Sequence, residues 1–429
     1  MFRNHSSLNR IRIKKLKRNA EKEMKINFIH LLFLGMLCCQ CSNAIEKITI
    51  CPNYITFRPN YKTTSYIRTL KGQKALYFSG PKYHGRPTRV FALIGIPNES
   101  HGKMLPGIVL VHGEGGTANA SWIQKWNQQG YAAIAIDLNG CLPRPVQDHE
   151  KMTWTRMPDG GPYGYEASFA QFSKKEPLEE QWPNYAVNAL SQAHSLLASF
   201  AQVDNKKIGI AGISWGGYLA CIEASLDSRY AFVISSYGCG FLTENSQRWN
   251  NEGNLKQWCQ HFDPAHYLSQ LNMPIFWLTG TRDSYYPLSA LEKSYDLVKS
   301  PVWLHLLEDM PHSFSAGCSP EEIYVFANQI TKKSTPLPAI LSQDLQSPNI
   351  ARVFYQSETK IVKADFLYTK ADPQKCNAKN NWITINATIN TNTSTKKITA
   401  EIPPNAQMFY FNLHDNRGLI ISSKIFHKK

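Results

Sequence analysis

The chain of 429 residues is longer than one ordinary domain, and its 47 Lys and Arg against 32 Asp and Glu give a net charge of +15. Residues 1–44 hold nine basic and two acidic residues, so they account for +7 of this charge and leave +8 on the rest. Because no run of Lys or Arg follows residue 44, the sequence gives no indication of a nucleic acid partner, and we expect at most mild attraction to polyanions such as acidic polysaccharides.

The amino-terminal segment, residues 1–44, has the three parts of a secretory signal peptide: a basic start, an apolar stretch at 28–37 and small residues at 42–44. The apolar stretch is shorter than the roughly 20 residues that span a bilayer, so we expect a secreted or periplasmic protein without a stable membrane span. Met24 would open a signal of ordinary length and is a candidate true start. A lipoprotein anchor is the alternative, although none of the three cysteines at suitable depth follows a small residue: Cys38, Cys39 and Cys41.

The seven cysteines after residue 44 are widely and irregularly spaced. This spacing fits no zinc site, and no motif in the chain requires a metal or another cofactor, so we expect none. An odd number leaves at least one thiol unpaired within a monomer. The pattern assigns neither a disulfide nor an oligomeric state.

Apolar runs alternate with helical periodicity through the middle of the chain. Residues 77–97 alternate as a hairpin does, 107–111 and 131–137 are continuous apolar runs, and 122–129 has the pattern of a helix. Strands and helices that alternate at this spacing predict an α/β fold with a doubly wound, mostly parallel sheet, which we place in residues 45–335.

A glycine-rich loop, residues 112–117, follows the first continuous apolar run. From that position the backbone N–H groups of Gly113, Glu114 and Gly115 can reach a tetrahedral intermediate. His112 begins the loop, and we expect it to hold the loop by hydrogen bonding rather than to transfer protons.

Residues 141–180 interrupt the alternation, because they are rich in Gly, Pro and aromatic residues. An insertion after the carboxyl end of a strand lies over the crevice in which such folds bind ligands. We therefore interpret it as a substrate-binding lid, with Trp154 as the candidate sugar-stacking residue. The alternative is a self-packed surface loop. Helical periodicity returns in residues 186–200.

The segment Gly212-Ile213-Ser214-Trp215-Gly216-Gly217 lies between an apolar run and a helix-like run. A strand, a glycine-framed serine and a helix in that order predict a nucleophile elbow. The glycines are needed because a side chain on either flank of so tight a turn would collide with the neighbouring backbone. The first N–H groups of the helix then point toward the serine, and the Trp215 N–H is placed to donate to an oxyanion.

An elbow serine needs a general base and an acid that orients the base. Asp283 follows a buried apolar run, and His312 lies in the loop after the next strand-like run, residues 302–307. We expect His312 to be the base and Asp283 the orienting acid, with Glu308 or Asp309 as the alternative acid.

Three further histidines are interpreted as non-catalytic. His305 alternates with apolar residues inside its strand, so a structural role with satisfied hydrogen bonds is expected. His261 and His266 lie in a polar region between elements, where nothing in the pattern predicts proton transfer.

The pattern changes beyond Ser334-Thr335-Pro336 to short alternating runs without helices. Six such runs predict a separate β-sandwich in residues 336–429. We expect it to pack against the α/β domain, with carbohydrate binding as the alternative. The predicted strands are 351–355, 361–368, 382–389, 397–402, 408–413 and 419–425.

The run from Asp204 to Tyr218, together with residues 112–117, resembles the acetyl xylan esterase, dienelactone hydrolase and prolyl oligopeptidase branch of the α/β-hydrolases. The resemblance extends over roughly residues 75–335. Segments 237–241 and 179–182 and the carboxyl-terminal strands are similar to secreted bacterial esterases that remove acyl or methyl groups from plant and algal polysaccharides.

The resemblance implies that Ser214, Asp283 and His312 are nucleophile, acid and base. Trp182, in the second of these segments, becomes a candidate substrate-binding residue. Glu114 departs from the pattern, because a glycine is expected there, and its carboxylate would oppose negative charge in the oxyanion hole unless the side chain turns away.

Together the motifs predict a secreted serine carbohydrate esterase that hydrolyses O-acetyl or methyl esters on plant-type polysaccharides through an acyl-enzyme. A pectin methylesterase is a close alternative, which the basic charge favours slightly. A serine peptidase related to prolyl oligopeptidase is less favoured, because the roughly 60 residues before the first core strand are too few for two propeller blades of about 40 residues each. A non-catalytic carbohydrate-binding protein is the remaining alternative, against which a complete triad argues.

Overall fold

The computed structural model describes residues 46–65, 67, 69–97, 104–143, 154–164, 172, 176–245, 254–371, 381–391 and 396–428. The predicted signal peptide, residues 1–44, and the candidate start Met24 lie outside them. Residues 47–429 form one compact unit, so the predicted division at residue 335 stays a prediction. None of the helices described is both long enough and apolar enough to cross a membrane.

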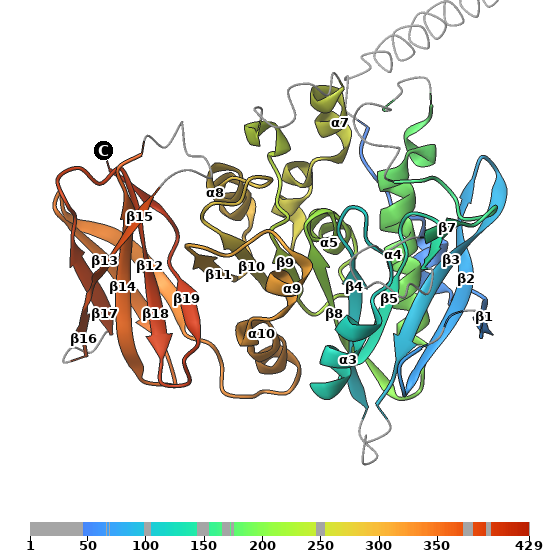
Figure 1. The fold of residues 1–429 in the computed structure, drawn as a ribbon, viewed down its shortest axis with the longest axis horizontal. Helices are drawn as coiled ribbons and strands as arrows, with labels where there is room; N and C mark the ends of the chain where they lie inside the picture. The colour runs from blue at the N-terminus through green and yellow to red at the C-terminus, as the bar shows by residue number, and fades with distance from the viewer. Residues whose placement is uncertain are drawn as a thin grey trace, which may run out of the picture. The chain divides into compact units, whose positions relative to one another are not determined.

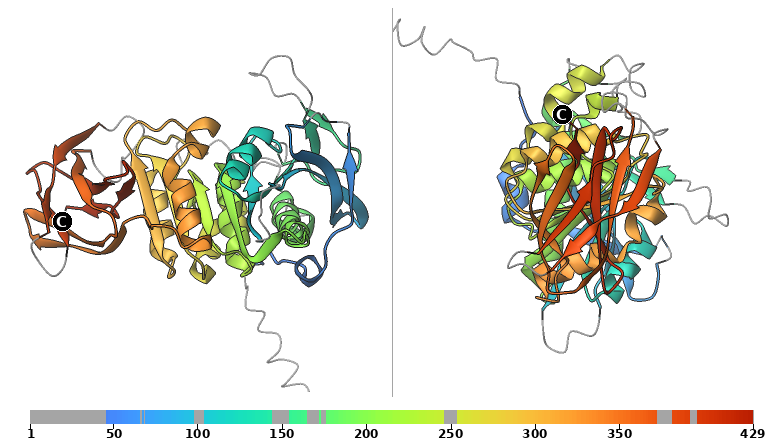
Figure 2. Two further views of the ribbon diagram at one scale, coloured as in Figure 1. Left: turned by 90° about the horizontal axis from the view of Figure 1, so that it is seen from below. Right: turned by 90° about the vertical axis from the view of Figure 1, so that its left-hand side faces the viewer.

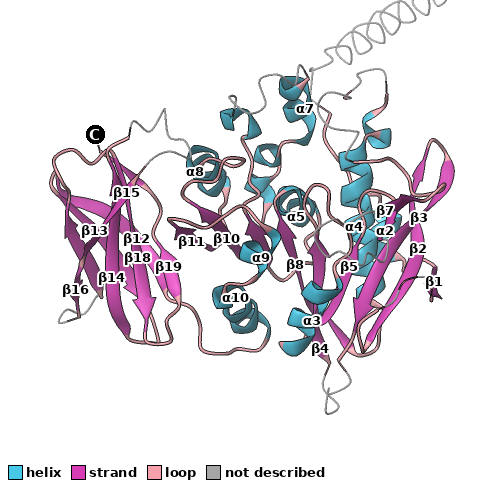
Figure 3. Cartoon of the chain, viewed as in Figure 1, coloured by secondary structure: helices cyan, strands magenta, loops and turns pink. Residues whose placement is uncertain are grey.

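A mixed sheet with a parallel centre forms the core of this unit (Figures 1 and 3). Its strands are β1 (Tyr61–Thr64), β2 (Gln73–Tyr83), β3 (Arg86–Gly95), β4 (Leu105–Val111), β5 (Ala132–Ile136), β8 (Val203–Ile213), β9 (Val233–Ser236), β10 (Ile275–Gly280) and β11 (Val302–Leu307). The order is β1-β2-β3-β5-β4-β8-β9-β10-β11, with parallel pairing from β5 to β11 and antiparallel pairing of the first three strands. The predicted α/β fold with a mostly parallel sheet is confirmed.

Helices cover the sheet, which explains why its central strands are apolar without alternation. The helices are α2 (Pro52–Thr56), α3 (Ala120–Gln128), α4 (Trp182–Ala198), α5 (Trp215–Leu226), α7 (Leu255–Phe262), α8 (Leu288–Leu297), α9 (Phe314–Cys318) and α10 (Glu321–Thr331). Every residue of β4 and β5 is buried. Figure 2 shows α3 and α4 on opposite faces of the sheet. The helix predicted at 186–200 begins four residues earlier, because Pro183 is well suited to its first turn.

The described part of the predicted lid contains one short hairpin. Strand β6 (Cys141–Pro143) pairs with β7 (Trp154–Arg156) in antiparallel register. Residues 144–153, 165–171 and 173–175 of the insertion lie outside the described residues.

The carboxyl-terminal strands form two antiparallel layers. They are β12 (Ala339–Ser347), β13 (Ile350–Gln356), β14 (Ile361–Thr369), β15 (Trp382–Asn386), β16 (Thr388–Asn390), β17 (Lys397–Glu401), β18 (Met408–Asp415), β19 (Ile420–Ser422) and β20 (Phe426–His427). One layer has the order β12-β13-β17-β16, whereas β19-β18-β14-β15 continues the central sheet beyond β11. The run predicted at 382–389 divides into two strands, and β12 was not predicted.

Strand β18 connects two hydrophobic cores. Phe409 and Phe411 face the core between the two carboxyl-terminal layers, whereas Met408 and Tyr410 belong to the core of the α/β part. Side chains on the two faces of β18 thus pack into different cores.

At the junction of β11 and β19, side chains form hydrogen bonds with backbone groups at the edge of the parallel sheet. The Leu306 N–H donates to Ser422 Oγ at 2.8 Å, and Ser422 Oγ in turn donates to Asn412 Oδ1 at 2.6 Å. An exposed edge strand is prone to pair with other chains, and here the carboxyl-terminal strands cover it.

Candidate active site

Ser214 lies in a tight turn between β8 and α5, at the carboxyl end of the parallel strands. Its backbone angles, φ 58° and ψ −120°, are ones that a residue with a side chain rarely adopts. A Cβ on Gly212 would overlap the carbonyl of Gly216, so strand and helix approach too closely for any side chain there. This is the geometry of the nucleophile elbow that the sequence predicts.

A chain of hydrogen bonds joins the three side chains that the sequence analysis selected. His312 Nε2 lies 2.9 Å from Ser214 Oγ, and His312 Nδ1 lies 2.7 Å from Asp283 Oδ2. A carboxylate only accepts, so the Nδ1–H of His312 donates to Asp283. The lone pair of Nε2 is therefore directed at the hydroxyl of Ser214, which suits proton removal.

The loop after β10 fixes the carboxylate of Asp283. Its side chain is 1% exposed, and Oδ1 accepts hydrogen bonds from the N–H groups of Tyr285 at 2.7 Å and Tyr286 at 2.9 Å. Because Oδ2 accepts a hydrogen bond from His312, both oxygens of the Asp283 carboxylate are hydrogen-bonded. The carboxylate therefore cannot rotate away from the imidazole without losing hydrogen bonds in a buried place.

Two tyrosine rings contact the imidazole of His312. The ring centroids of Tyr237 and Tyr285 lie 4.3 Å and 4.4 Å from that of His312. The hydroxyl of Tyr237 also reaches the carbonyl oxygens of Pro311 at 2.8 Å and Ser313 at 3.2 Å, which flank His312 in the chain. Tyr237 thus positions both the ring and the loop of His312.

Sequence reasoning did not assign a role to Tyr237. Its segment entered only through the resemblance, and no local motif indicates that a tyrosine after β9 reaches a loop 74 residues later. A positive φ of 71° at Tyr237 is the structural sign that this residue is held in place by its contacts.

The loop after β4 passes directly beside the serine. A Cβ on Gly113 would lie 3.2 Å from the Cβ of Ser214 and 2.9 Å from a backbone oxygen of the elbow, so glycine allows this approach. Gly115 has φ +68°, and Glu114 is exposed. Trp215 begins α5, where the helix dipole favours negative charge. The assignment of oxyanion donors among these residues stays a prediction.

His112 holds the loop as the sequence analysis expects. Its Nδ1 lies 2.7 Å from the carbonyl oxygen of Gly113, and its Nε2 lies 2.9 Å from the N–H of Leu138. Burial lowers the pKa of His112, so the ring is neutral, donates through Nδ1 and accepts through Nε2. Both ring nitrogens of His112 are thus hydrogen-bonded to backbone groups, at Gly113 and at Leu138.

The alternative orienting acids are paired elsewhere. Arg282 Nη2 lies 3.1 Å from Glu308 Oε1 and 3.2 Å from Asp309 Oδ1. These contacts favour Asp283, which alone of the three has a hydrogen bond to His312 within the described residues.

The other histidines have structural contacts. His305 is 2% exposed and its Nδ1 lies 2.8 Å from the carbonyl oxygen of Ile420 in β19. His266 Nε2 lies 2.8 Å from the carbonyl oxygen of Cys259, and the ring of His261 stacks on Phe172 with centroids 6.0 Å apart.

Of the two candidate substrate-binding tryptophans, the structure describes the side chain of Trp182 only. Trp182 is 8% exposed, and its Nε1 donates to the carbonyl oxygen of Leu138 at 2.7 Å. Its ring packs edge-on against that of Trp215, with centroids 6.4 Å apart. Direct contact of Trp182 with substrate stays a prediction. The side chain of Trp154 lies outside the described residues.

The cysteines and acidic residues give no sign of a cross-link or a metal centre in the described ranges. Cys51, Cys141, Cys221, Cys239, Cys259 and Cys318 are free thiols, and Cys376 lies outside these ranges. The same ranges contain no group of three or more His, Cys, Asp or Glu side chains suited to hold a metal ion.

A comparison with models of protein families matches residues 90–331 to the dienelactone hydrolase family. The chain belongs to the dienelactone hydrolase family. The match covers more than half of the chain and includes Ser214, Asp283 and His312. With a serine at its elbow, this dienelactone hydrolase family member is a serine ester hydrolase. A search of curated proteins finds no match to it.

Among solved structures, this family member is similar to acetyl xylan esterase 1 from Thermoanaerobacterium sp. JW/SL YS485, with 15% identity and a TM-score of 0.46, over 63% of this chain and 91% of the other. A glucuronoyl esterase from Solibacter usitatus has 16% identity and a TM-score of 0.43, over 63% and 86% of the two chains. A puromycin-hydrolyzing peptidase from Mycobacterium tuberculosis has 18% identity and a TM-score of 0.47, over 62% and 42%.

Proposed function

We propose that this protein is a secreted serine carbohydrate esterase that removes O-acetyl or methyl groups from plant-type polysaccharides through an acyl-enzyme. The observation that carries the serine mechanism is the hydrogen-bond chain from Ser214 through His312 to Asp283. The substrate class is supported by the resemblance of segments 179–182 and 237–241 to polysaccharide esterases and by the basic charge of the chain.

In the proposed acylation step, His312 Nε2 takes the hydroxyl proton of Ser214 as Oγ attacks the ester carbonyl. Asp283 holds the imidazole and stabilises its charged form. The oxyanion is bound by the N–H of Trp215 and by N–H groups in the loop at 113–115. His312 then donates its proton to the leaving alcohol, and the acyl group remains on Ser214.

In the proposed deacylation step, His312 takes a proton from water, which attacks the acyl-enzyme. The tetrahedral intermediate uses the same oxyanion donors, and its collapse returns the proton from His312 to Ser214 Oγ and releases the acid. For an acetyl ester the acid is acetate and the alcohol is the sugar. For a methyl ester the alcohol is methanol and the acid is a uronate.

We assign substrate contacts to Trp154 and Trp182 and to the insertion at 141–180, which follows the carboxyl end of β5. We also propose that residues 45–335 are the catalytic domain and that residues 336–429 are a packing domain. The latter assignment is supported by the way in which β19 continues the sheet from β11.

The test measures acetate and methanol release by the purified protein from acetylated xylan and from methylated, acetylated pectin. Acetate release that is lost in Ser214→Ala supports a deacetylase, and methanol release from pectin identifies a methylesterase. If neither product forms while a fluorophosphonate still labels Ser214, the polysaccharide esters are the wrong substrates, and peptide substrates would be tried next. Absence of labelling would support a non-catalytic carbohydrate-binding protein.

A further inference from the structure

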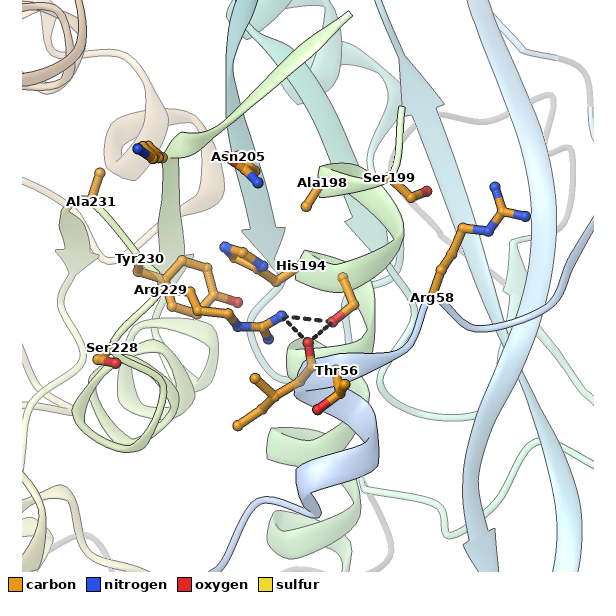
Figure 4. Close-up of a pocket in the computed structure, with 13 residues that line it drawn as sticks. Thr56, Arg58, His194, Ala198, Ser199, Asn205, Ser228, Arg229, Tyr230 and Ala231 are labelled. Carbon is orange, nitrogen blue, oxygen red and sulfur yellow. Dashed lines mark hydrogen bonds between the residues drawn. The ribbon is translucent and has the colours of Figure 1, made fainter. Parts of the chain in front are cut away.

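A cavity of about 660 Å³ lies at the end of the parallel strands that is remote from Ser214 (Figure 4). Its lining includes Asn205 and Lys206, near the start of β8, whereas Ser214 follows the end of that strand. Ser214 lies eight residue steps after Lys206 along this strand, which corresponds to roughly 26 Å. The cavity is therefore distinct from the site that holds the triad.

Four segments that are distant in sequence converge on this cavity. They are the end of α2 with Arg58, the last turns of α4, the start of β8, and the loop between α5 and β9. The volume is within the range of about 300–1,000 Å³ that is typical of small-ligand sites.

The charge of the lining is entirely positive. No acidic residue lines the cavity, whereas Arg58, Lys206 and Arg229 do. Arg58 and Lys206 are exposed, and neither forms an ion pair within the described residues. The nearest carboxylate in sequence, Asp204, pairs with Lys207 at 3.3 Å. Two cations therefore remain available to an anionic ligand.

Arg229 is held rigidly beside the cavity. Asp227, whose side chain is 1% exposed, forms an ion pair with the guanidinium of Arg229. The Nη1 of Arg229 also donates to Ser195 Oγ at 2.7 Å and to the carbonyl oxygen of Ile55 at 3.0 Å (Figure 4). These contacts fix the wall of the cavity before any ligand arrives.

His194 contributes an unsatisfied polar group to the same wall. Its side chain is 1% exposed, and neither ring nitrogen has a hydrogen bond of normal geometry. Burial lowers the pKa of His194 to about 3, so the ring is neutral. Both ring nitrogens are buried behind the surface of the cavity, so His194 adds to its wall but no contact with a ligand is assigned to it.

The remaining polar lining suits sugar hydroxyl groups. Thr56, Ser199 and Ser228 supply hydroxyls, and Asn205 supplies an amide (Figure 4). The hydroxyls of Thr56 and Ser199 donate within their own helices and so offer acceptors to a sugar. The amide of Asn205 can both donate and accept, and the exposed cations favour a carboxylate.

We propose that this cavity is a second binding site that takes a saccharide bearing carboxylate groups, such as a run of hexuronate residues. Arg58 and Lys206 would bind the carboxylates, and the hydroxyl and amide groups would bind the ring substituents. Such a site would hold an acidic polysaccharide on the enzyme independently of the ester that reacts at Ser214. The proposal goes beyond the esterase function and does not depend on it.

The experiment titrates trigalacturonate, which carries no ester, into the full-chain protein at low salt by calorimetry, with xylotriose as the neutral ligand. The double variant Arg58→Gln/Lys206→Gln should bind trigalacturonate at least about fivefold more weakly than the wild type, because it removes two exposed ion pairs. A matched double variant, Lys360→Gln/Lys370→Gln, loses the same charge at two exposed residues that flank β14 and should bind as the wild type does.

A second pair of variants locates the ligand within the cavity. Ala198 lines the cavity at the end of α4, so Ala198→Glu places a negative charge inside it and should weaken trigalacturonate binding at least about tenfold. Ala198→Gln adds nearly the same volume without the charge and should bind clearly better than Ala198→Glu. Thermal melting of each variant establishes that it is folded.

Equal affinity of the two double variants for trigalacturonate would overturn the proposal. Equal affinity of Ala198→Glu and Ala198→Gln would also overturn it, as would equal affinity of the wild type for xylotriose and trigalacturonate. Hydrolysis of a small acetate ester by Arg58→Gln/Lys206→Gln should match the wild type. If no ester is cleaved by any protein but the binding differences hold, the proposed function fails while the second site stands.

Discussion

The contact of Tyr237 with the His312 loop leads to a specific prediction for Tyr237→Phe. The change removes one hydroxyl that serves the carbonyl oxygens of Pro311 and Ser313, and it keeps the ring on the imidazole. Because Tyr237 is 2% exposed, water cannot easily replace the lost donor. Each carbonyl oxygen keeps a backbone donor, the N–H of Ser313 for Pro311 and that of Gly317 for Ser313. The change therefore costs about the 0.5–1.5 kcal/mol of one net hydrogen bond, and this cost falls on the loop that carries His312.

The expected result is a loss of rate rather than of substrate binding. A displacement of 1 Å in a reacting group can cost roughly 100-fold, and retention of the ring limits the displacement of His312. We therefore expect kcat for a small acetate ester to fall about 5- to 20-fold in Tyr237→Phe, with KM changed less than about twofold. Tyr237→Leu, which also removes the ring, should lose about a further tenfold.

The matched control is Tyr131→Phe. Tyr131 is fully buried, and its hydroxyl lies 2.6 Å from Thr331 Oγ1, away from the triad. The control should lose comparable stability in chemical unfolding but keep its kcat. If both variants lower kcat equally, or if Tyr237→Phe raises KM alone, the positioning role of Tyr237 is refuted.

Three further predictions follow from other buried contacts. Asp283→Asn should lower kcat/KM for an acetate ester by about 10³- to 10⁴-fold, because His312 would favour the wrong tautomer, and a loss below tenfold would argue against Asp283 as the orienting acid. Burial raises the pKa of Glu223 well above its ordinary 4.5, so the folded chain retains a proton that the unfolded chain releases, and stability falls as pH rises from about 4.5 toward the raised value. Glu223→Gln should therefore lose less Tm than the wild type between pH 5 and pH 8, and an equal loss would contradict this. Ser422→Ala should lower the free energy of unfolding by about 1–3 kcal/mol, because the N–H of Leu306 loses its acceptor, and an unchanged denaturation midpoint would show that this junction contributes little.

Much of the α/β core could be predicted because its signals are local. Each parallel strand contains a short apolar run, and each side chain of the triad lies within five residues of the end of its own strand. The chain order of Ser214, Asp283 and His312 then identifies them without knowledge of tertiary contacts. The elbow could be predicted because the crowding at Gly212 comes from Gly216, only four residues later in the sequence.

Other features depend on contacts between distant segments. Strand β12 alternates partly exposed and exposed residues and carries few apolar side chains, so its pattern is too weak to recognise. The continuation of the sheet from β11 to β19 rests on a single ladder pair, Leu304 with Ser422, and on side-chain hydrogen bonds. The contact of Tyr237 with the His312 loop has no local signal either. Sequence periodicity reports which face of an element is buried but not which element covers it.

Whether Ser214 is the nucleophile can be tested by comparing Ser214→Ala with the wild type in hydrolysis of a small acetate ester. The intact mass of each protein is also measured after a fluorophosphonate is added. We expect a rate loss of roughly a million-fold in the variant, with one probe adduct on the wild type and none on the variant. A variant that keeps its rate within about tenfold, or that still takes up the probe at the same stoichiometry, would contradict the assignment of Ser214 as the nucleophile.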